Sequence, residues 1–591
     1  MAPRAKATAP KPKATAATTK KPGASTATKK TKAAAAPAKK TATNGASKKR
    51  KASDDDDDDL ANKDVPEVKK AKRSAKSATP AVKDDDHDDE KNKEDAEPEA
   101  KNKKKKQPAT AAASKRAKSA TPAPAPAPVK RTKSATPAPR DPRPQVAIGR
   151  KINDAPTQVL DIYVFGEGTS GELGLGSKRV NGKKPIDVKR PRLNDNLKNV
   201  VQLSCGGMHV VALTSDNQIL TWGVNDQGAL GRDTSWDGGL RDMDKPDGSD
   251  SEDDDDDTGI NPRESTPTAV SDVHFAANTR FVQVVASDSA SFALTEDGRV
   301  YGWGTFRSSD GILGFTDKIR VQYTPLILPT LKGITSLTAG ANHILALDAK
   351  GNVSAWGCGQ QNQLARRIIE RNKLSSLTPQ GVGLPRGKIA KVACGSYHSF
   401  AVDKSGTVWG WGLNNFGEVG IGSNAGEDDA VILRPAKITA LDGHAIQDID
   451  GGGHHSLACN DKGELLTWGR VDGYQVGIDK AMLTKDNAIF DDRNDPRILV
   501  VPTVVPDVSN VTRVAAGTDN SFAVTGDGKV YSWGFSSNYQ TGQGVMDDIE
   551  KPTIVDNTAI RGKKIVLAGA GGQFSVVMGI HEDETNGTNE T

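Results

Sequence analysis

The 591-residue chain has few cysteines and few aromatic side chains, and it lacks long apolar runs. Its four cysteines, Cys205, Cys358, Cys394 and Cys459, stand far apart and form no C-x-x-C pair. This spacing excludes a zinc cluster and a disulfide framework, and it favours four buried reduced thiols. No apolar run approaches the ~20 residues that span a bilayer, and no apolar signal core follows Met1. We therefore expect an intracellular protein.

Motifs of covalent chemistry and cofactor binding are also missing from the sequence. It contains no Gly-Lys-Ser/Thr phosphate loop, no metal-binding box and no nucleophile elbow. The run Gly569-Ala-Gly-Gly572 resembles a phosphate loop, but it lies on the register of a repeat and we expect no helix after it. These absences predict a protein without cofactor, metal or small-molecule substrate.

Positive charge is concentrated at the N-terminal end of the chain. Residues 1–150 hold 38 Lys and Arg against 19 Asp and Glu, whereas the rest of the chain holds 42 against 56. Residues 1–147 are mostly Ala, Lys, Pro, Thr and Asp, which cannot bury enough apolar surface to offset the entropy lost on folding. We therefore expect a disordered basic tail there, and any polyanionic partner should meet it.

Three basic clusters lie within this tail. Each one could be a nuclear import signal bound by an import receptor, a phosphate contact to DNA, or a solubilising stretch. Three clusters on one arm favour nuclear entry and nonspecific, salt-sensitive binding to chromatin. The clusters are Lys48, Lys49, Arg50 and Lys51; Lys69, Lys70, Lys72 and Arg73; and Lys103, Lys104, Lys105 and Lys106.

The rest of the chain contains a repeat that ends in Trp-Gly. Thirteen residues before each Trp stands a His or a substitute, with a Gly or Ser three residues before it and a Gly or Asn eight residues after it. Gly and Asn suit hairpin turns with positive φ, so each copy is expected to form a strand, a turn and a second strand. The copies end at Trp222, Trp303, Trp356, Trp411, Trp468 and Trp533, and Phe165-Gly166 is a degenerate seventh copy.

The two ends of the repeat array complement each other. The N-terminal copy has Phe165-Gly166 without a preceding Gly-x-x-His strand, and the segment from Gly571 has that strand without a following Trp-Gly. Sharing one blade between the two ends closes a ring and removes exposed sheet edges. We predict an all-β, seven-bladed β-propeller over residues 148–580, with about four strands a blade. An acidic disordered insert at 242–260 and a short disordered tail at 581–591 complete the predicted organisation.

The recurring His of the repeat could be read as a metal ligand. However, the positions occur once per blade, and Ala290, Asn520 and Phe574 replace the His without pattern. Metal ligands need to cluster, so we expect these His side chains to pack or to form hydrogen bonds near the hairpins. The tryptophans are expected to pack between blades.

One turn of the repeat is longer than the others. A Gly follows the aromatic residue by six positions at Gly171, Gly228 and Gly417, but by eight positions after Trp303. The two extra residues must bulge from the surface, either as a tolerated insertion or as a functional loop. The loop comprises Phe306, Arg307, Ser308, Ser309, Asp310 and Gly311.

In this order, Gly-x-x-His, Ala-Leu, Trp-Gly and Gly-x-Leu-Gly resemble the repeat of the regulator of chromosome condensation family. The resemblance covers residues 157–580. Two stretches, Asn225–Ser235 and Gly304–Gly314, resemble the family members that exchange guanine nucleotide on the small GTPase Ran. The resemblance implies that the longer loop is a β-wedge that enters the GTPase near its phosphate-binding loop.

Residues that precede the repeat His should face one end of the propeller channel. Asp288, Asn342, His454 and Asp519 occupy such positions, and the resemblance implies roles in exchange for the first three. At Asn342 the resembled animal protein has an acidic residue, so a neutral hydrogen bond to the GTPase is expected here. Of the neighbouring pair His454 and His455, we expect His454 to be exposed and His455 to be in the core.

The resemblance therefore implies a chromatin-associated guanine-nucleotide exchange factor for Ran that makes and breaks no covalent bond. Such a protein supplies Ran-GTP for nucleocytoplasmic transport and for control of the mitotic spindle and nuclear envelope. A noncatalytic propeller scaffold on chromatin is the alternative. The acidic insert could repel DNA or attract the basic arm, and the sequence does not distinguish these possibilities.

Overall fold

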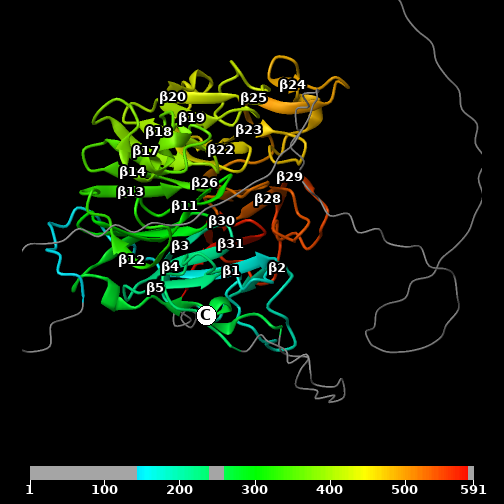
Figure 1. Cartoon of the computed structure of the whole chain (residues 1–591). Coiled ribbons are helices and arrows are strands. Elements are labelled where there is room, and N and C mark those ends of the chain that lie inside the picture. Colours follow the sequence, from blue (N-terminus) through cyan, green and yellow to red (C-terminus); the bar gives the residue numbers. More distant parts are fainter. Residues whose placement is uncertain (1–142, 238–257, 583–591) are drawn as a thin grey trace, which may run out of the picture. The chain divides into compact units, whose positions relative to one another are not determined.

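The computed structural model describes residues 143–237 and 258–582. The predictions for the basic clusters and for residues 1–142, 238–257 and 583–591 lie outside these residues. The innermost strands of successive sheets contact one another, and the last one contacts the first, so the sheets form a closed ring. The seven sheets confirm the predicted seven-bladed β-propeller (Figure 1). None of the helices in the described residues is long and apolar enough to cross a membrane.

The blades are numbered here by the chain order of their innermost strands. The first blade contains β3 (Val200–Cys205), β4 (His209–Thr214), β5 (Ile219–Gly223) and β6 (Thr268–Ala269). The second contains β7 (Phe281–Ala286), β8 (Ala290–Thr295), β9 (Val300–Gly304) and β12 (Gln322–Ile327). The third contains β13 (Ile334–Ala339), β14 (His343–Asp348), β15 (Val353–Gly357) and β16 (Gln380–Gly381). The fourth contains β17 (Ile389–Cys394), β18 (His398–Asp403), β19 (Val408–Leu413) and β20 (Val431–Lys437).

The fifth blade has an additional outer strand, and the seventh is assembled from both ends of the array. The fifth contains β21 (Ile446–Gly451), β22 (His455–Asn460), β23 (Leu465–Arg470), β25 (Pro496–Val504) and β24 (Ala488–Phe490). The sixth contains β26 (Val511–Ala516), β27 (Asn520–Thr525), β28 (Val530–Gly534) and β29 (Ile549–Ile554). The seventh contains β30 (Ile565–Ala570), β31 (Phe574–Ile580), β1 (Leu160–Gly166) and β2 (Val188–Leu193).

Outside the blades, the described residues form one two-stranded hairpin and a few short helical turns. The hairpin pairs β10 (Phe306–Ser308) with β11 (Gly311–Gly314). The turns are α1 (Pro262–Ser265), η2 (Asp272–His274), η3 (Glu370–Leu377), η4 (Thr439–Leu441) and η5 (Lys480–Met482).

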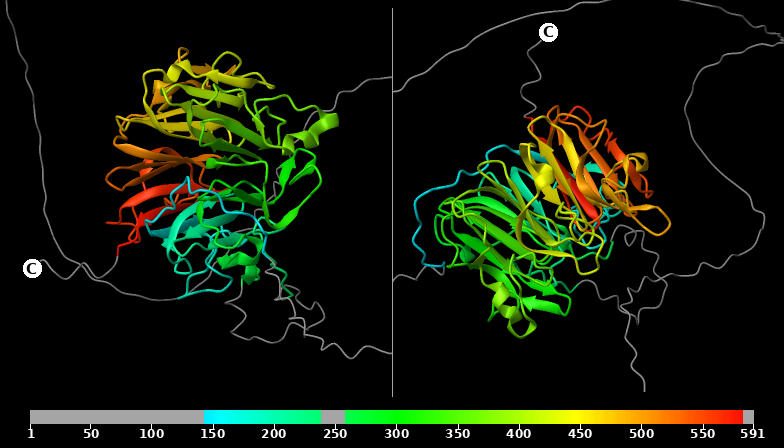
Figure 2. Two further views of the ribbon diagram at one scale, coloured as in Figure 1. Left: turned by 90° about the vertical axis from the view of Figure 1, so that its left-hand side faces the viewer. Right: turned by 90° about the horizontal axis from the view of Figure 1, so that it is seen from above.

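The shared seventh blade closes the ring as predicted. β1 pairs antiparallel with β31 over its whole length, from Leu160 opposite Ile580 to Gly166 opposite Phe574. In Figures 1 and 2 the red end of the chain accordingly lies beside the cyan strands of its beginning. Two segments that are far apart in sequence thus satisfy each other's strand edges, which an open array would expose.

The tryptophans and the repeat histidines join neighbouring blades. Each Trp of the repeat is at most 2% exposed. The indole of Trp468, for example, donates to the Glu418 carbonyl of the preceding blade at 2.7 Å. His398 Nε2 lies 2.8 Å from the hydroxyl of Ser456 in the next blade. The predictions of inter-blade packing and hydrogen bonding are therefore confirmed.

Two glycine positions of the repeat are set by close contacts with these histidines. A Cβ at Gly395 would lie 2.1 Å from Cε1 of His398, so the Gly-x-x-His turn has no space for a side chain. Gly412 has a φ of +110° and lies against the carbonyl of Tyr397, so Trp-Gly also requires glycine. The motif is thus a packing unit in which glycine leaves room for the imidazole.

Three cysteines are buried as predicted, but Cys205 is half-exposed. Cys205 lies on β3 and lines the axial channel, a cavity of about 340 Å³ bounded by the inner strands. The expectation of four buried thiols was therefore wrong for Cys205, whereas Cys394, which ends the innermost strand of the fourth blade and lines the same channel, is buried.

The segment before β1 lies on the face of the ring opposite the Trp-Gly ends. Gly149 N donates to Asp297 Oδ2 at 2.7 Å, and the Asn153 side chain donates to the carbonyls of Thr295 and Ile334. These acceptors stand at the turn between β8 and β9 and at the start of β13, whereas β9 ends at Trp303-Gly304 on the other face. The described chain therefore begins on the face opposite the long hairpin.

Residues near two predicted segment boundaries, the end of the acidic insert at 260 and the end of the propeller at 580, pack against the propeller. Ile260 is buried and Thr258 N donates to the Ser177 carbonyl, so the last residues of the 242–260 range, predicted to be disordered, lie against the β1–β2 connection of the seventh blade. His581 N donates to the Val159 carbonyl, which extends the packed region just beyond residue 580.

Candidate functional site

A cavity of about 1070 Å³ opens at one end of the channel, and we refer to it as the funnel. Each inner strand turns at this end into the strand that begins with the repeat His. The residue directly before the repeat His, or before the residue that replaces it, therefore lies in the wall of the funnel. Each of the seven blades contributes one such residue. They are Met208, Ser289, Asn342, Tyr397, His454, Asp519 and Gln573, and the hairpin adds Arg307, Ser308 and Ser309.

The structure thus brings most of the predicted residues together. Asn342, His454, Asp519 and three residues of the hairpin line one cavity. Asp288 also lines the funnel, although it stands two residues before the repeat position Ala290. Ser289 is the residue of this blade that matches Asn342, His454 and Asp519. The hairpin and His454 are therefore on the same face of the ring.

The predicted bulge is the β10–β11 hairpin, which replaces the regular outer turn of the second blade. Phe306 is fully buried and stacks on Phe292 with ring centroids 6.0 Å apart. Its side chain is part of the core, so it can hold the hairpin but cannot contact a docked protein. Arg307, Ser309 and Asp310 are exposed, whereas Ser308 and Gly311 are half-buried.

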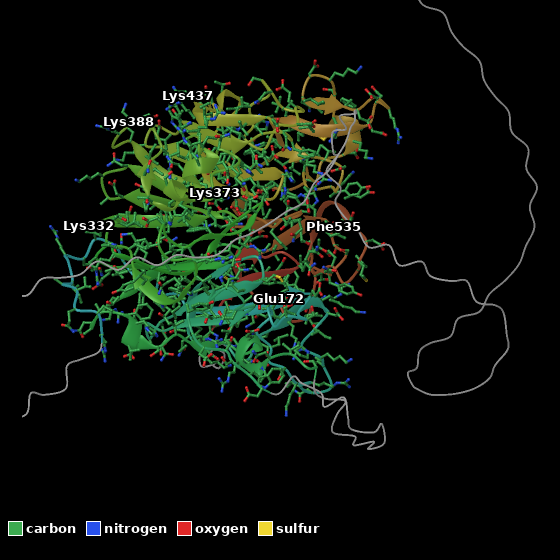
Figure 3. All side chains as sticks on the ribbon, viewed as in Figure 1. Glu172, Lys332, Lys373, Lys388, Lys437 and Phe535 are labelled. Atoms are coloured by element: carbon green, nitrogen blue, oxygen red, sulfur yellow. The ribbon has the colours of Figure 1, made fainter. Side chains whose placement is uncertain are left out.

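Neighbouring residues of the third blade hold the hairpin in place. The Gln360 side chain accepts from Ser309 N at 2.9 Å and donates to Ser309 Oγ at 2.7 Å. Lys373 of η3, labelled in Figure 3, forms an ion pair with Asp310 at 2.9 Å. The hairpin tip is therefore supported from one side and open toward the funnel on the other.

Asn342 links the hairpin to Asp288. Its side-chain oxygen accepts from Arg307 N at 2.8 Å, and its amide nitrogen donates to Asp288 Oδ2 at 3.2 Å. An acidic residue at position 342 could accept from Arg307 N, but as a carboxylate it could not donate to Asp288. Asn342 thus makes two neutral hydrogen bonds within this chain, and its contact with a GTPase stays a prediction.

The carboxylate of Asp288 has an unusual environment. It contacts solvent in the funnel, but surrounding protein atoms remove much of its hydration and raise its pKa to about 6. The positive charge of Arg307 and the hydrogen bond from Asn342 oppose this rise. Asp288 therefore changes charge near neutral pH, unlike an ordinary aspartate.

His454 is half-buried rather than fully exposed, while its neighbour His455 is buried in the core. The Nδ1 atom of His454 lies 2.9 Å from Oε1 of Glu418, a residue of the fourth blade that is 0% exposed. The imidazole packs 4.9 Å from the ring of Phe416. The two histidines were correctly assigned to the funnel side and to the core.

Asp519 accepts a hydrogen bond from Gln475 of the preceding blade at 3.0 Å. Residues such as Glu418, Gln475, Gln360 and Lys373 were missed in the sequence because their partners belong to other blades. A signal was present for two of them: Glu418 and Gln475 stand seven residues after the repeat Trp. The described residues include no group of three or more His, Cys, Asp or Glu placed to hold a metal ion.

Two comparisons identify chains that are similar in sequence and structure. Guanine nucleotide exchange factor SRM1 from Saccharomyces cerevisiae is 42% identical over 72% of this chain and 88% of its own length. The crystal structure of Prp20p from the same yeast, described with its binding properties to Gsp1p and histones, matches with a TM-score of 0.65. The match has 39% identity over 72% of this chain and 93% of that one.

A second solved structure shows Kap60 bound to yeast RCC1 (Prp20), and it matches with a TM-score of 0.65 and 37% identity over 78% of this chain and 98% of that one. The family model described as RCC1-like domain matches residues 161–577, which span the ring from β1 to β31. Since the repeats, the closed ring and these matches agree, the chain belongs to the RCC1-like domain family.

Proposed function

We propose that this protein is a chromatin-bound guanine-nucleotide exchange factor for the small GTPase Ran, and that it supplies Ran-GTP for nucleocytoplasmic transport and for spindle and nuclear envelope control. The observation that carries this proposal is the convergence of the hairpin and the polar rim residues on a single funnel. The relative named as a guanine nucleotide exchange factor supports the same activity.

In this proposal the GTPase docks over the funnel, and the exposed tip of the hairpin enters it beside the nucleotide phosphates. Arg307, Ser309 and Asp310 form the inserted tip, and Asp288, Asn342, His454 and Asp519 contact the GTPase around it. Exchange needs no covalent step, because the factor acts by stabilising the nucleotide-free GTPase. Binding is reciprocal, so nucleotide that returns to the GTPase weakens the complex by the same factor.

The energetic demand is modest for such an interface. A 10⁴-fold acceleration of nucleotide release corresponds to about 5.5 kcal/mol of differential stabilisation. Phe306 and the hydrogen bonds that Arg307 N donates to Asn342 and Ser309 N donates to Gln360 keep the hairpin in one conformation, so little of the binding energy is spent on ordering it.

The basic tail at residues 1–147 would hold this activity on chromatin in the nucleus. Its three clusters suit an import receptor and the DNA backbone, and solved relatives are described with histones and with Kap60. The described chain begins on the face opposite the hairpin, so a docked GTPase would leave that starting point uncovered.

Release of labelled GDP from purified Ran tests the proposal. Catalytic amounts of the full chain should accelerate release by orders of magnitude. Unaccelerated release, with the protein still bound to chromatin, would favour a noncatalytic scaffold.

A further inference from the structure

One repeat position carries a Gln or Glu that supports the outer turn of its blade. The position lies seven residues after the aromatic, and the side-chain oxygen accepts from the backbone N–H two residues earlier. This bond joins Ser170 N to Glu172, Gln361 N to Gln363, Phe416 N to Glu418, Gly473 N to Gln475 and Asn538 N to Gln540, at 2.8 to 3.0 Å. A Gln therefore supports this turn as well as a Glu does.

In two blades the other polar atom of this side chain reaches the funnel residue of the next blade. The amide of Gln475 donates to Asp519 at 3.0 Å. The carboxylate of Glu418 lies 2.9 Å from Nδ1 of His454. The two hydrogen bonds run in opposite directions. The amide of Gln475 donates to the Asp519 carboxylate, whereas the carboxylate of Glu418 can only accept from an imidazole N–H of His454.

The surroundings of Glu418 leave its carboxylate few alternatives. It is 0% exposed, and one oxygen already accepts from Phe416 N at 2.9 Å. The imidazole of His454 packs against the ring of Phe416 at 4.9 Å, with Tyr397 further away at 6.4 Å. With Nδ1 turned to the buried carboxylate, the ring has only Nε2 to present to the funnel.

We propose that Glu418 is a positioning residue for nucleotide exchange, because its carboxylate accepts Nδ1–H of His454 and so leaves Nε2 to face the docked GTPase as a hydrogen-bond acceptor. The proposal rests on the exchange function proposed above. A carboxylate behind an imidazole commonly selects the tautomer in this way. No other described blade pairs a buried carboxylate with a histidine at these two positions.

The substitution E418Q tests this role with little disturbance of the fold. Gln occupies the same position in three other blades, so it should still accept from Phe416 N. Its amide N–H would then donate to Nδ1 of His454 and move the ring proton to Nε2. The matched control is E172Q, because Glu172, labelled in Figure 3, supports its turn in the same way but has Met208 at the funnel position of the next blade.

Two measurements are made on the full chain. Nitrogen-15 NMR of labelled histidines, with H454Q used to assign the signals, reports which ring nitrogen carries the proton. Release of labelled GDP from Ran reports exchange. We expect the Nδ1–H tautomer in the wild type and in E172Q, and the Nε2–H tautomer in E418Q. Exchange should fall about 10- to 100-fold in E418Q, as expected when the donor of the docked GTPase that faces Nε2 is left without an acceptor, and stay unchanged in E172Q.

An Nε2–H tautomer in the wild-type protein would overturn the inference, and so would normal exchange in an E418Q protein whose tautomer has changed. The wild-type spectrum shows which tautomer His454 adopts even if E418Q does not fold. If the wild-type protein has the Nδ1–H tautomer but does not accelerate GDP release from Ran, the proposed exchange function is wrong. The pairing of Glu418 with His454 would still stand.

Discussion

Replacement of the hairpin tip, Arg307 to Asp310, by a short glycine turn should separate folding from exchange. The tip contributes no core side chain, because Phe306 and Leu313 supply the buried contacts on either side of it. The change removes the hydrogen bonds from Arg307 N to Asn342 and from Ser309 N to Gln360. Together these stabilise the folded state by about 2 kcal/mol. A domain of ordinary stability, about 5–15 kcal/mol, should therefore remain folded.

The expected loss in exchange is much larger than the loss in stability. If the inserted tip supplies half of the roughly 5.5 kcal/mol needed for a 10⁴-fold acceleration, its removal slows exchange by about 100-fold. The ion pair between Lys373 and Asp310 is exposed, so its loss should matter little to folding. The assay is release of labelled GDP from Ran over a range of exchange-factor concentrations, together with a chemical denaturation curve.

The hairpin between β24 and β25 provides a matched control. Its turn, Asp491–Asp495, is also exposed and does not line the funnel. A glycine turn there should leave exchange at the wild-type rate. A folded tip variant that exchanged nucleotide within about threefold of that control would exclude a role for the tip in exchange.

Three further predictions concern the core, the charge of the rim and the tail. F306A should lower the free energy of unfolding by about 3–5 kcal/mol, since it removes a fully buried aromatic ring, whereas S309A, which loses the hydrogen bond from Gln360 at the exposed tip, should lower it by about 1 kcal/mol or less. The raised pKa of Asp288, about 6, means that any stability linked to this group is present at low pH and lost as the pH rises through 6. The KM for Ran should fall as Asp288 ionises between about pH 5 and 7; an equal step in D288N would assign the titration to another group. Deleting residues 1–142 should leave exchange in solution intact and abolish most of the salt-sensitive affinity for DNA; undiminished affinity would place the DNA site on the propeller.

The number of blades and the closure of the ring were readable from the sequence. Both follow from local chemistry that repeats: glycine where an imidazole needs space, as at Gly395, and Trp-Gly where a strand ends against the preceding blade. The complementary halves at Phe165 and Phe574 specified the shared blade because each half lacks what the other supplies. Such features depend on neighbours within one repeat or on the register between repeats.

The chemistry of the funnel was decided by the tertiary structure. Sequence spacing indicated that His454 faces the channel end, but it did not show that Glu418 of another blade binds its Nδ1. The hairpin was visible as an insertion, yet only packing revealed that Phe306 belongs to the core and that Asn342 ties Arg307 to Asp288. A repeat determines the position of each side chain along its own strand, whereas the polar partners come from adjacent blades and depend on how the ring closes.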